Sequence, residues 1–241
     1  MRLDNRIPNE MRDIEFIPNY TVHAEGSVLV SYGATKVICT ASVEPNLPKW
    51  MQGNGRGWVT AEYSMLPRAT HTRSKRDKAN NSGRSVEISR LIGRSLRAAV
   101  DLQKLGERQI LVDCDVIQAD GGTRTASITG AFVAIALACK HLLDDGVLKE
   151  IPLNAYVGAV SVGLGPEGAL LDLNYEEDSS IDTDMNFVVN SKQQFIEIQG
   201  TAEGQAFSKQ EMDQMIDFAY QGCDEIFDAQ EKIIGDFYPR Q

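Results

Sequence analysis

The segment Asp113–Ala126 constrains what this chain can fold into more than any other part of its sequence. Residues 110–117 are apolar except for Asp113 and Asp115, which indicates a strand. Because side chains alternate between the two faces of a strand, these two carboxylates share one face. A turn and an apolar stretch long enough for a helix come next. The segment therefore predicts a strand that runs into a helix through a tight turn.

The turn between this strand and this helix has the composition of an anion site. The pair Gly121–Gly122 permits a sharp turn and a close approach of backbone to a ligand. Either Thr123 or Thr125 can cap the helix, whose N-terminus presents unpaired N–H groups and the positive end of a dipole. Arg124 adds a planar guanidinium, which suits phosphate. The same residues are also compatible with an ordinary corner that carries a surface arginine.

A second arginine is predicted at the start of another helix. Residues 85–105 carry apolar side chains at i, i+3 and i+4 spacing, which predicts one helix that ends at Gly106. Arg84 lies at its N-terminal end and is a second candidate phosphate ligand. Three further arginines, each three or four residues from the next, are expected along one side of this helix: Arg90, Arg94 and Arg97.

The charge of the chain is unevenly distributed. Its formal net charge of −10 at first argues against a nucleic-acid partner. Residues 68–97, however, contain nine Lys and Arg against two acidic residues, and local fields decide where a polyanion docks. Residues 67–83 have no periodic apolar pattern and predict a long exposed loop that contains Arg68, Arg73 and Arg76. Such a loop either binds a polyanion or is only a solvated charged surface.

An acidic cluster lies nearer the C-terminus. Five carboxylates fall between Glu176 and Asp184, where they repel one another. A charged surface turn would need no ligand. Alternatively, the cluster binds a divalent cation such as Mg²⁺, because hard cations take oxygen ligands.

Several kinds of site and location are excluded by what the sequence lacks. The four cysteines are scattered without a CxxC pair, and Cys39, Cys114 and Cys139 lie in apolar segments, which indicates buried thiols in a reducing cytoplasm. The three histidines are too dispersed for a zinc site. No apolar run approaches the ~20 residues that span a bilayer, and the N-terminus lacks the apolar segment of a secretory signal. We therefore expect a cytoplasmic protein without a membrane partner.

The nucleophile is expected to come from outside the chain. The sequence has neither a plausible Ser-His-Asp or Cys-His arrangement nor a Gly-x-x-x-x-Gly-Lys-Ser/Thr loop. Two arginines at helix starts, an acidic cluster and a basic loop suit phosphoryl chemistry. A bound inorganic phosphate or a water molecule could then be the attacking group.

The order of the predicted elements indicates the fold class. Strands and long helices alternate, and most strands are joined by hairpins, for example residues 20–31 and 35–43 across Gly33. This favours an α+β fold with two similar lobes, in which helices pack on mixed or antiparallel sheets. We place the N-terminal lobe at about residues 1–145 and the C-terminal lobe at about residues 146–241 of a single domain. A capping box at Ser208 and Glu211 predicts the start of the last helix.

Nearly the whole chain resembles the ribonuclease PH family of phosphorolytic exoribonucleases, which trim tRNA 3′ ends. The matching stretches are Asn19–Thr21, His23–Val30, Gly57–Tyr63, Met65–Arg73, Asp113–Gly130, Glu177–Ser179, Thr183–Asn186 and Gln199–Gly204. Two departures are small. Leu3 and Asn5 replace the Pro and Gly usual in this family, and Ile181 replaces a smaller residue in the acidic loop.

The resemblance implies an assembly and a set of site residues. It implies a two-lobed α+β fold and a homohexamer arranged as a trimer of dimers. The family's phosphate site falls on Arg84 and on the turn Gly122-Thr123-Arg124. Its essential acidic pair falls on Asp178 and Asp184, which would also hold Mg²⁺. Its tRNA-contacting segment falls on Arg68, Arg73 and Arg76.

The implied reaction is that of a tRNA nucleotidyltransferase. Inorganic phosphate would attack the last phosphodiester of a tRNA precursor and release a nucleoside diphosphate, and the reverse reaction would add nucleotides. Asp178 or Asp184 would bind Mg²⁺ or protonate the leaving ribose oxygen. Two rivals are a catalytically silent ring subunit and a plain RNA-binding module. The presence of Arg84, Arg124, Asp178 and Asp184 together weighs against the first, and the acidic pair would have no purpose in the second.

Overall fold

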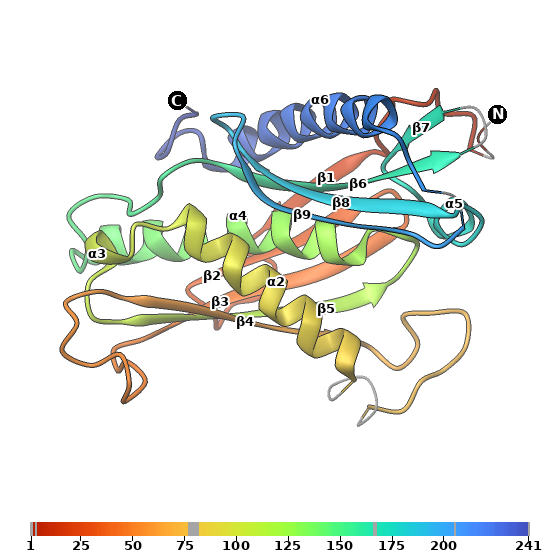
Figure 1. The fold of residues 1–241 in the computed structure, drawn as a ribbon. Helices are drawn as coiled ribbons and strands as arrows, with labels where there is room; N and C mark the ends of the chain where they lie inside the picture. The colour runs from red at the N-terminus through yellow and green to blue at the C-terminus, as the bar shows by residue number, and fades with distance from the viewer. Residues whose placement is uncertain (1, 3, 77–81, 166–167, 205, 241) are drawn as a thin grey trace.

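The computed structural model describes residues 2, 4–76, 82–165, 168–204 and 206–240. Within them, the first sheet has five strands in the order β1-β2-β3-β5-β4 (Figure 1). All neighbouring strands are antiparallel except β4 and β5, which run parallel. The bounds are β1 Ile14–Pro18, β2 Gly26–Tyr32, β3 Thr35–Glu44, β4 Trp58–Met65 and β5 Gln109–Gln118.

The second sheet has four strands in the order β7-β6-β8-β9, and its neighbours are all antiparallel. Its bounds are β6 Val157–Gly165, β7 Gly168–Leu171, β8 Thr183–Asn190 and β9 Phe195–Ala202. The strands of each sheet thus come from a separate part of the chain. This arrangement confirms the α+β class, while the lobe boundary near residue 145 stays a prediction.

The helices lie between and around the sheets. Helix α4 (Thr123–Asp144) lies between them and packs on β2, β3, β5 and β6 (Figure 1). Helix α2 (Gly83–Ala99) packs on β4, and α6 (Lys209–Ile234) packs on β6, β7 and β1. Two short helices are also present, α3 (Leu102–Leu105) and α5 (Tyr175–Asp178). The predicted capping box of α6 is confirmed, since Ser208 and Glu211 each accept from the other's backbone N–H.

The prediction that no apolar run is long enough to span a bilayer is wrong for helix α4. It is the one helix in the described residues whose length and composition would allow a crossing, and 78% of that window is buried inside the protein. Its small residues let it approach the first sheet closely. A Cβ at Gly130, for example, would lie 2.5 Å from Val30 Cγ1. A helix that is apolar on all sides is here the core of the fold.

The single helix predicted over residues 85–105 is also wrong. Val100 adopts an extended conformation and bridges to Leu153, which ends α2. Asp101 then caps α3 by accepting 3.1 Å hydrogen bonds from the amides of Gln103 and Lys104. The apolar spacing continues across this break, so periodicity alone could not reveal it. The predicted end at Gly106 is confirmed, with φ 71°.

Candidate active site

The turn between β5 and α4 forms one side of the candidate active site. Gly121 and Gly122 have φ values of 72° and 63°, in the left-handed region that glycine adopts without strain. Gly122 is the N-cap of α4 and offers no side chain for the helix amides. The prediction that Thr123 or Thr125 caps the helix is therefore wrong. Thr125 donates its hydroxyl to the Gly122 carbonyl, and Thr123 pairs with Tyr63.

This turn is held from two sides. The Thr35 hydroxyl, at the start of β3, donates to the Gly121 carbonyl at 2.6 Å and accepts from the Asp120 amide at 2.9 Å. On the other side, Gly121 packs on the backbone that leads to α5, where a Cβ would lie 2.4 Å from the Leu173 carbonyl oxygen. A side chain at this position would separate the turn from that segment, so the turn needs glycine for contact as well as for φ.

Arg124 leaves the first turn of α4 and is fixed by two other elements. Its Nη1 donates to Gln199 Oε1 on β9 at 2.7 Å. Gln199 Nε2 donates in turn to Glu87 Oε1 on α2 at 3.0 Å, and Arg124 lies 3.6 Å from the same carboxylate oxygen. Three elements distant in sequence therefore orient one guanidinium. A preorganised charge costs no rearrangement at the moment of reaction.

Tyr63, on β4, contacts the turn of residues 121–124, which we call the phosphate turn after its predicted ligand. Its hydroxyl lies 2.8 Å from the Thr123 hydroxyl, and its ring is buried. Burial raises the pKa of Tyr63, whereas the Thr123 hydrogen bond and the positive charges of Arg84 and Arg124 act to lower it. Both predicted phosphate-binding arginines therefore exert their charge at this hydroxyl. Arg84 itself is exposed in the first turn of α2, after the N-cap Ser82.

Asp178 lies close to Asp184 and to the same two arginines. Asp178 ends α5, and Asp184 lies in β8. Partial burial raises the pKa of Asp178 most, the negative charge of Asp184 raises it further, and the charges of Arg84, Arg124 and Arg12 oppose both effects. The structure therefore brings together the four charged residues that the sequence placed in one site. They come from α2, α4, α5 and β8.

The basic segment 68–76 adjoins this site. Arg68, Arg73 and Arg76 are exposed, as predicted, while Ala69 is buried and its carbonyl accepts from the Ala119 amide at 2.9 Å. The ring of His71 lies 5.5 Å from that of Tyr175, the first residue of α5. The start of the segment is therefore hydrogen-bonded to Ala119, which follows β5 and precedes the phosphate turn. Its middle contacts α5, the helix that carries Asp178.

Comparison with known proteins settles the family. Residues 10–140 match domain 1 of the 3′ exoribonuclease family, and residues 155–222 match its domain 2. The chain belongs to the 3′ exoribonuclease family. It is 56% identical over 238 residues to a protein of Bdellovibrio bacteriovorus named ribonuclease PH, covering 99% of this chain and 98% of that one. This chain is accordingly a phosphorolytic 3′–5′ exoribonuclease.

Solved structures share the fold of this exoribonuclease. Rice (Oryza sativa) Rrp46 aligns with a TM-score of 0.78 at 19% identity, over 97% of this chain and all of that one. An Archaeoglobus fulgidus exosome with RNA bound to the active site aligns with a TM-score of 0.81 at 24% identity, over 94% of this chain and 91% of that one. An archaeal exosome core aligns with a TM-score of 0.73 at 26% identity, over 96% and 90%.

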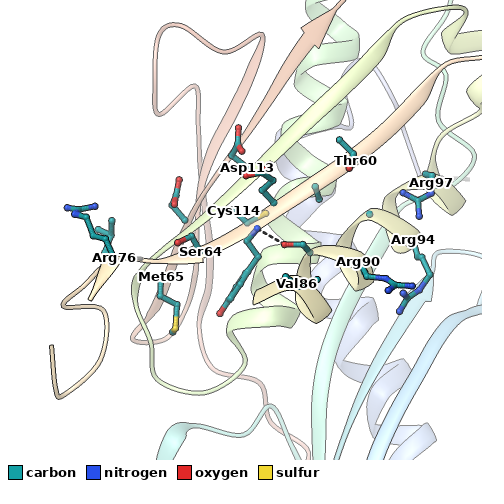
Figure 2. A pocket seen from close by; sticks show the side chains of 17 residues that line it. Thr60, Ser64, Met65, Arg76, Val86, Arg90, Arg94, Arg97, Asp113 and Cys114 are labelled. Carbon is teal, nitrogen blue, oxygen red and sulfur yellow. Dashed lines mark hydrogen bonds between the residues drawn. The ribbon is translucent and has the colours of Figure 1, made fainter. Parts of the chain in front are cut away.

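A groove of about 680 Å³ runs between α2 and the strands β4 and β5 of this exoribonuclease (Figure 2). Its charged lining residues are Glu62, Asp113, Asp115, Arg76, Arg90, Arg94 and Arg97. Asp113 and Asp115 share one strand face and the α2 arginines share one side, as predicted. Burial, with Glu62 and Asp115 nearby, raises the pKa of Asp113. The groove lining does not include Arg84, Thr123 or Arg124, but it does include Tyr63, whose hydroxyl lies 2.8 Å from that of Thr123.

Three residues of the site were missed in the sequence. Tyr63 and Gln199 lie inside stretches that resemble the family, yet neither residue type by itself indicates phosphate chemistry. Glu87 is one of the two acidic residues in the basic region 68–97, and its charge there did not indicate a role in the site. Their roles depend on contacts between β4, β9, α2 and α4, which sequence spacing cannot show.

Proposed function

We propose that this exoribonuclease trims the 3′ ends of tRNA precursors, with inorganic phosphate held by Arg84, Thr123 and Arg124. The observation that carries the assignment is the convergence of Arg84 and Arg124 on Asp178, whose pKa both of them influence. Two positive side chains and an uncapped helix start at Gly122 suit a phosphate dianion. An acidic pair at the same place suits proton transfer or a cation.

The proposed reaction is an in-line displacement. An oxygen of the bound phosphate attacks the last phosphorus of the RNA, and the bond from that phosphorus to the ribose 3′ oxygen breaks. The leaving oxygen takes up a proton, and the phosphate becomes the terminal phosphoryl group of a nucleoside diphosphate. Arg84 and Arg124 offset the repulsion between two anions, which is the main catalytic requirement of such a step. Proton donation and Mg²⁺ binding are alternative roles for each carboxyl of the acidic pair, and the raised pKa of Asp178 favours this residue as the donor when no cation is bound to it.

Mg²⁺ is the proposed cofactor, held by Asp178 and Asp184. Groups of three or more potential ligands do not occur in the described part of the chain, so a cage made only of protein is not expected there. Two neighbouring carboxylates fit Mg²⁺, which keeps several waters and commonly binds through one or two carboxylates with substrate phosphates. When bound, the ion would neutralise charge that develops on the phosphoryl oxygens.

Asp184 is tested by replacement with Asn. The amide neither carries charge for Mg²⁺ nor donates a carboxyl proton, so we expect Asp184→Asn to release no nucleoside diphosphate at a useful rate. Asp182→Asn is a matched control, because Asp182 is exposed and lies two residues before Asp184. A folded Asp184→Asn protein with near wild-type turnover would reject the role of the acidic pair.

The basic segment is the proposed tRNA contact. Exposed arginines bind phosphate oxygens and position a structured RNA without reading its sequence. Arg68, Arg73 and Arg76 have this exposure and lie next to the acidic helix α5 through the His71–Tyr175 contact. The tRNA body would then lie over this segment while its 3′ end enters the phosphate site.

The proposed assembly is a homohexamer arranged as a trimer of dimers in the cytoplasm. The family resemblance supports it, and one archaeal protein of similar fold is part of an exosome core. Light scattering on the purified protein should give the mass of six chains. A stable monomer with full activity on tRNA would reject the hexamer.

The experiment that tests the proposed substrate is an incubation with a tRNA precursor in the presence and absence of inorganic phosphate. We expect shortened RNA and nucleoside diphosphates only when phosphate is present. A linear RNA of the same length without tRNA structure is the control, and it should have a higher KM. Equal KM values for the two RNAs would contradict tRNA as the preferred substrate, whereas nucleoside monophosphates as products would contradict the phosphate site.

A further inference from the structure

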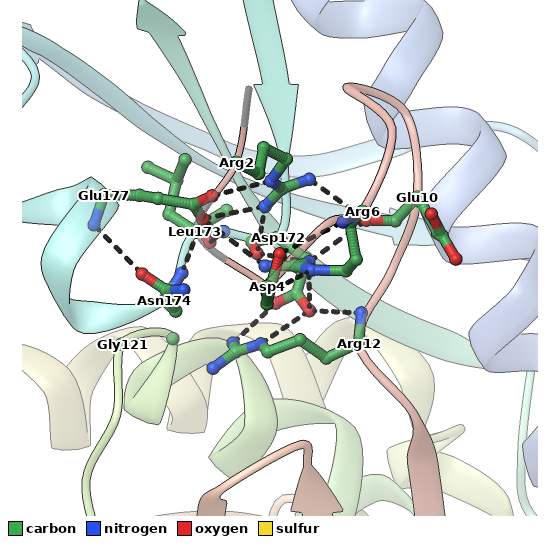
Figure 3. Close-up of polar contacts among 12 residues, drawn as sticks. Arg2, Asp4, Arg6, Glu10, Arg12, Gly121, Asp172, Leu173, Asn174 and Glu177 are labelled. Atoms are coloured by element: carbon green, nitrogen blue, oxygen red, sulfur yellow. Dashed lines mark hydrogen bonds and ion pairs between the residues drawn. The ribbon is translucent and has the colours of Figure 1, made fainter.

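Arg12 is a buried arginine that no step of the proposed reaction uses. It lies two residues before β1 and is 7% exposed. Its Nε and backbone N–H donate to Asp172 Oδ2 at 2.8 and 2.9 Å, and its Nη2 donates to Asp172 Oδ1 at 2.7 Å (Figure 3). Asp172 is fully buried. Such a pair is a fixed contact, because either charge left alone would be uncompensated in the interior.

The same guanidinium also reaches the phosphate turn. Arg12 Nη1 donates to the Asp120 carbonyl at 2.5 Å, one residue before Gly121. A Cβ at Gly122 would lie 3.0 Å from Arg12 Nη2, so the guanidinium borders the turn closely. One side chain therefore contacts the turn that bears Arg124 and the segment that leads to Asp178. Its planar fork of donors makes these contacts possible at one time.

Asp172 has an unusual backbone for a residue other than glycine. Its φ of 51° lies in the left-handed region, where a side chain is strained. Surrounding contacts hold it there: its amide donates to the Ser161 carbonyl at 2.7 Å, and its carbonyl accepts from Arg2 and Arg6 at 3.1 and 3.0 Å. The chain leaves β7 at Leu171 and turns here toward α5.

The N-terminal arginines extend this contact to the residue beside Asp178. Arg2 donates to both carboxylate oxygens of Glu177, from Nε at 2.6 Å and from Nη2 at 2.8 Å (Figure 3). Glu177 in turn accepts from the Asn174 amide and completes the capping box of α5. A strained residue and a buried ion-pair network thus fix the short helix that ends in Asp178.

We propose that Arg12 is a positioning residue for phosphorolysis, which sets the distance between the phosphate turn and the segment that carries Asp178. The inference rests on the proposed function, which assigns Arg124 and Asp178 to the reaction. Arg12 itself contacts neither of these side chains through a hydrogen bond in the described structure and acts through Asp120 and Asp172. A misplacement of about 1 Å between reacting groups can lower a rate roughly a hundredfold.

The test compares Arg12→Lys with the wild-type full-length protein. Lysine keeps the charge, but its single ammonium cannot hold the Asp172 carboxylate in two places and the Asp120 carbonyl as well. With a short oligoribonucleotide and saturating phosphate, we expect kcat to fall about tenfold to a hundredfold. The KM for the oligonucleotide should stay within about twofold, since Arg12 is bound to Asp172 and Asp120 and is not assigned to RNA binding. Asp172→Asn keeps one side-chain oxygen as an acceptor for Arg12, and it should also lower kcat.

A stability control separates positioning from folding. Phe227 is buried in α6, an element that bears none of the assigned site residues, and Phe227→Leu should lower the melting temperature while leaving kcat unchanged. Assays are run well below the lowest melting temperature. The inference is overturned if Arg12→Lys and Asp172→Asn keep kcat within twofold of wild type. It is also overturned if Phe227→Leu, at an equal loss of melting temperature, shows an equal fall in kcat.

A parallel Arg124→Ala assay distinguishes the two proposals. If Arg124→Ala loses turnover and the Arg12 and Asp172 variants do not, only the positioning role fails. If Arg124→Ala keeps full turnover, the phosphate assignment fails, and the positioning role fails with it.

Discussion

The Arg124 guanidinium and the Gln199 amide are joined by a 2.7 Å hydrogen bond between α4 and β9. Gln199 also donates to Glu87, so it links Arg124, the proposed phosphate-binding arginine, to α2, the helix that begins beside Arg84. One neutral side chain therefore connects the two halves of the phosphate site. The orientation of Arg124 depends on the second sheet, although the residue itself follows a strand of the first.

Replacing this amide should weaken the site without removing either arginine. In Gln199→Leu, the Arg124 guanidinium loses its hydrogen bond to the Gln199 amide and should move toward Glu87. We expect kcat to fall roughly tenfold, because a small displacement of a charged group has a large effect on rate. Gln221→Leu is the matched control, since Gln221 lies in α6 and bonds Asn9 instead of Arg124 or Glu87. A Gln199→Leu protein as active as this control would contradict the role of the link.

The negative charge of Asp178 should lower the free energy of unfolding at neutral pH. Its pKa is raised in the folded protein, so the unfolded chain ionises more readily, and the folded state is penalised wherever Asp178 is charged. Asp178→Asn should therefore raise the midpoint of urea unfolding at pH 7 to 8 while removing activity. The difference in urea midpoint between the variant and wild type should shrink as the pH falls toward the pKa of Asp178, because the wild-type carboxyl then becomes neutral. A midpoint that falls at pH 7 would contradict this account of Asp178.

The basic segment is expected to affect tRNA more than short RNA. Alanine at Arg68, Arg73 and Arg76 together should raise the KM for a tRNA precursor and flatten its salt dependence, by a slope of up to about 3 if each binds one phosphate. A short single-stranded oligonucleotide should be degraded almost normally, and the affinity for inorganic phosphate should not change.

The contact between His71 and Tyr175 makes the oligonucleotide the deciding substrate in that experiment. The segment touches the helix that carries Asp178, so its arginines could in principle act on the reaction itself. Equal losses on tRNA and oligonucleotide across a salt series would show that they do, and the proposed division between RNA binding and chemistry would be rejected.

Local patterns predicted the parts of this site that depend on neighbouring residues in sequence. The strand before the phosphate turn, the exposed arginines of the basic segment and the capping box at Ser208 follow from spacing and composition. Asn5, which stands where the family has Gly, has φ 65°, as expected of a residue that tolerates the left-handed region.

Features that depend on tertiary contact could not be predicted in the same way. The break at Val100 arises from a bridge to Leu153, and the apolar pattern continues across it. Thr123 and Thr125 were the two candidate caps of α4, but Thr123 pairs with Tyr63 on β4 and Thr125 donates to the Gly122 carbonyl. The N-terminal arginines gave no functional signal in the sequence, yet Arg2 and Arg12 bind the segment that carries Asp178.

The central claim is that Arg124 holds the attacking phosphate, and a phosphate titration on Arg124→Ala tests it most directly. The rate of nucleoside diphosphate release from a short oligoribonucleotide is measured over a wide range of phosphate concentration, for wild type and variant. Loss of one preorganised charge contact should lower the rate ~10²–10³-fold at saturating phosphate, with RNA binding nearly unchanged. A variant that keeps more than roughly a tenth of wild-type turnover at saturating phosphate would contradict the account.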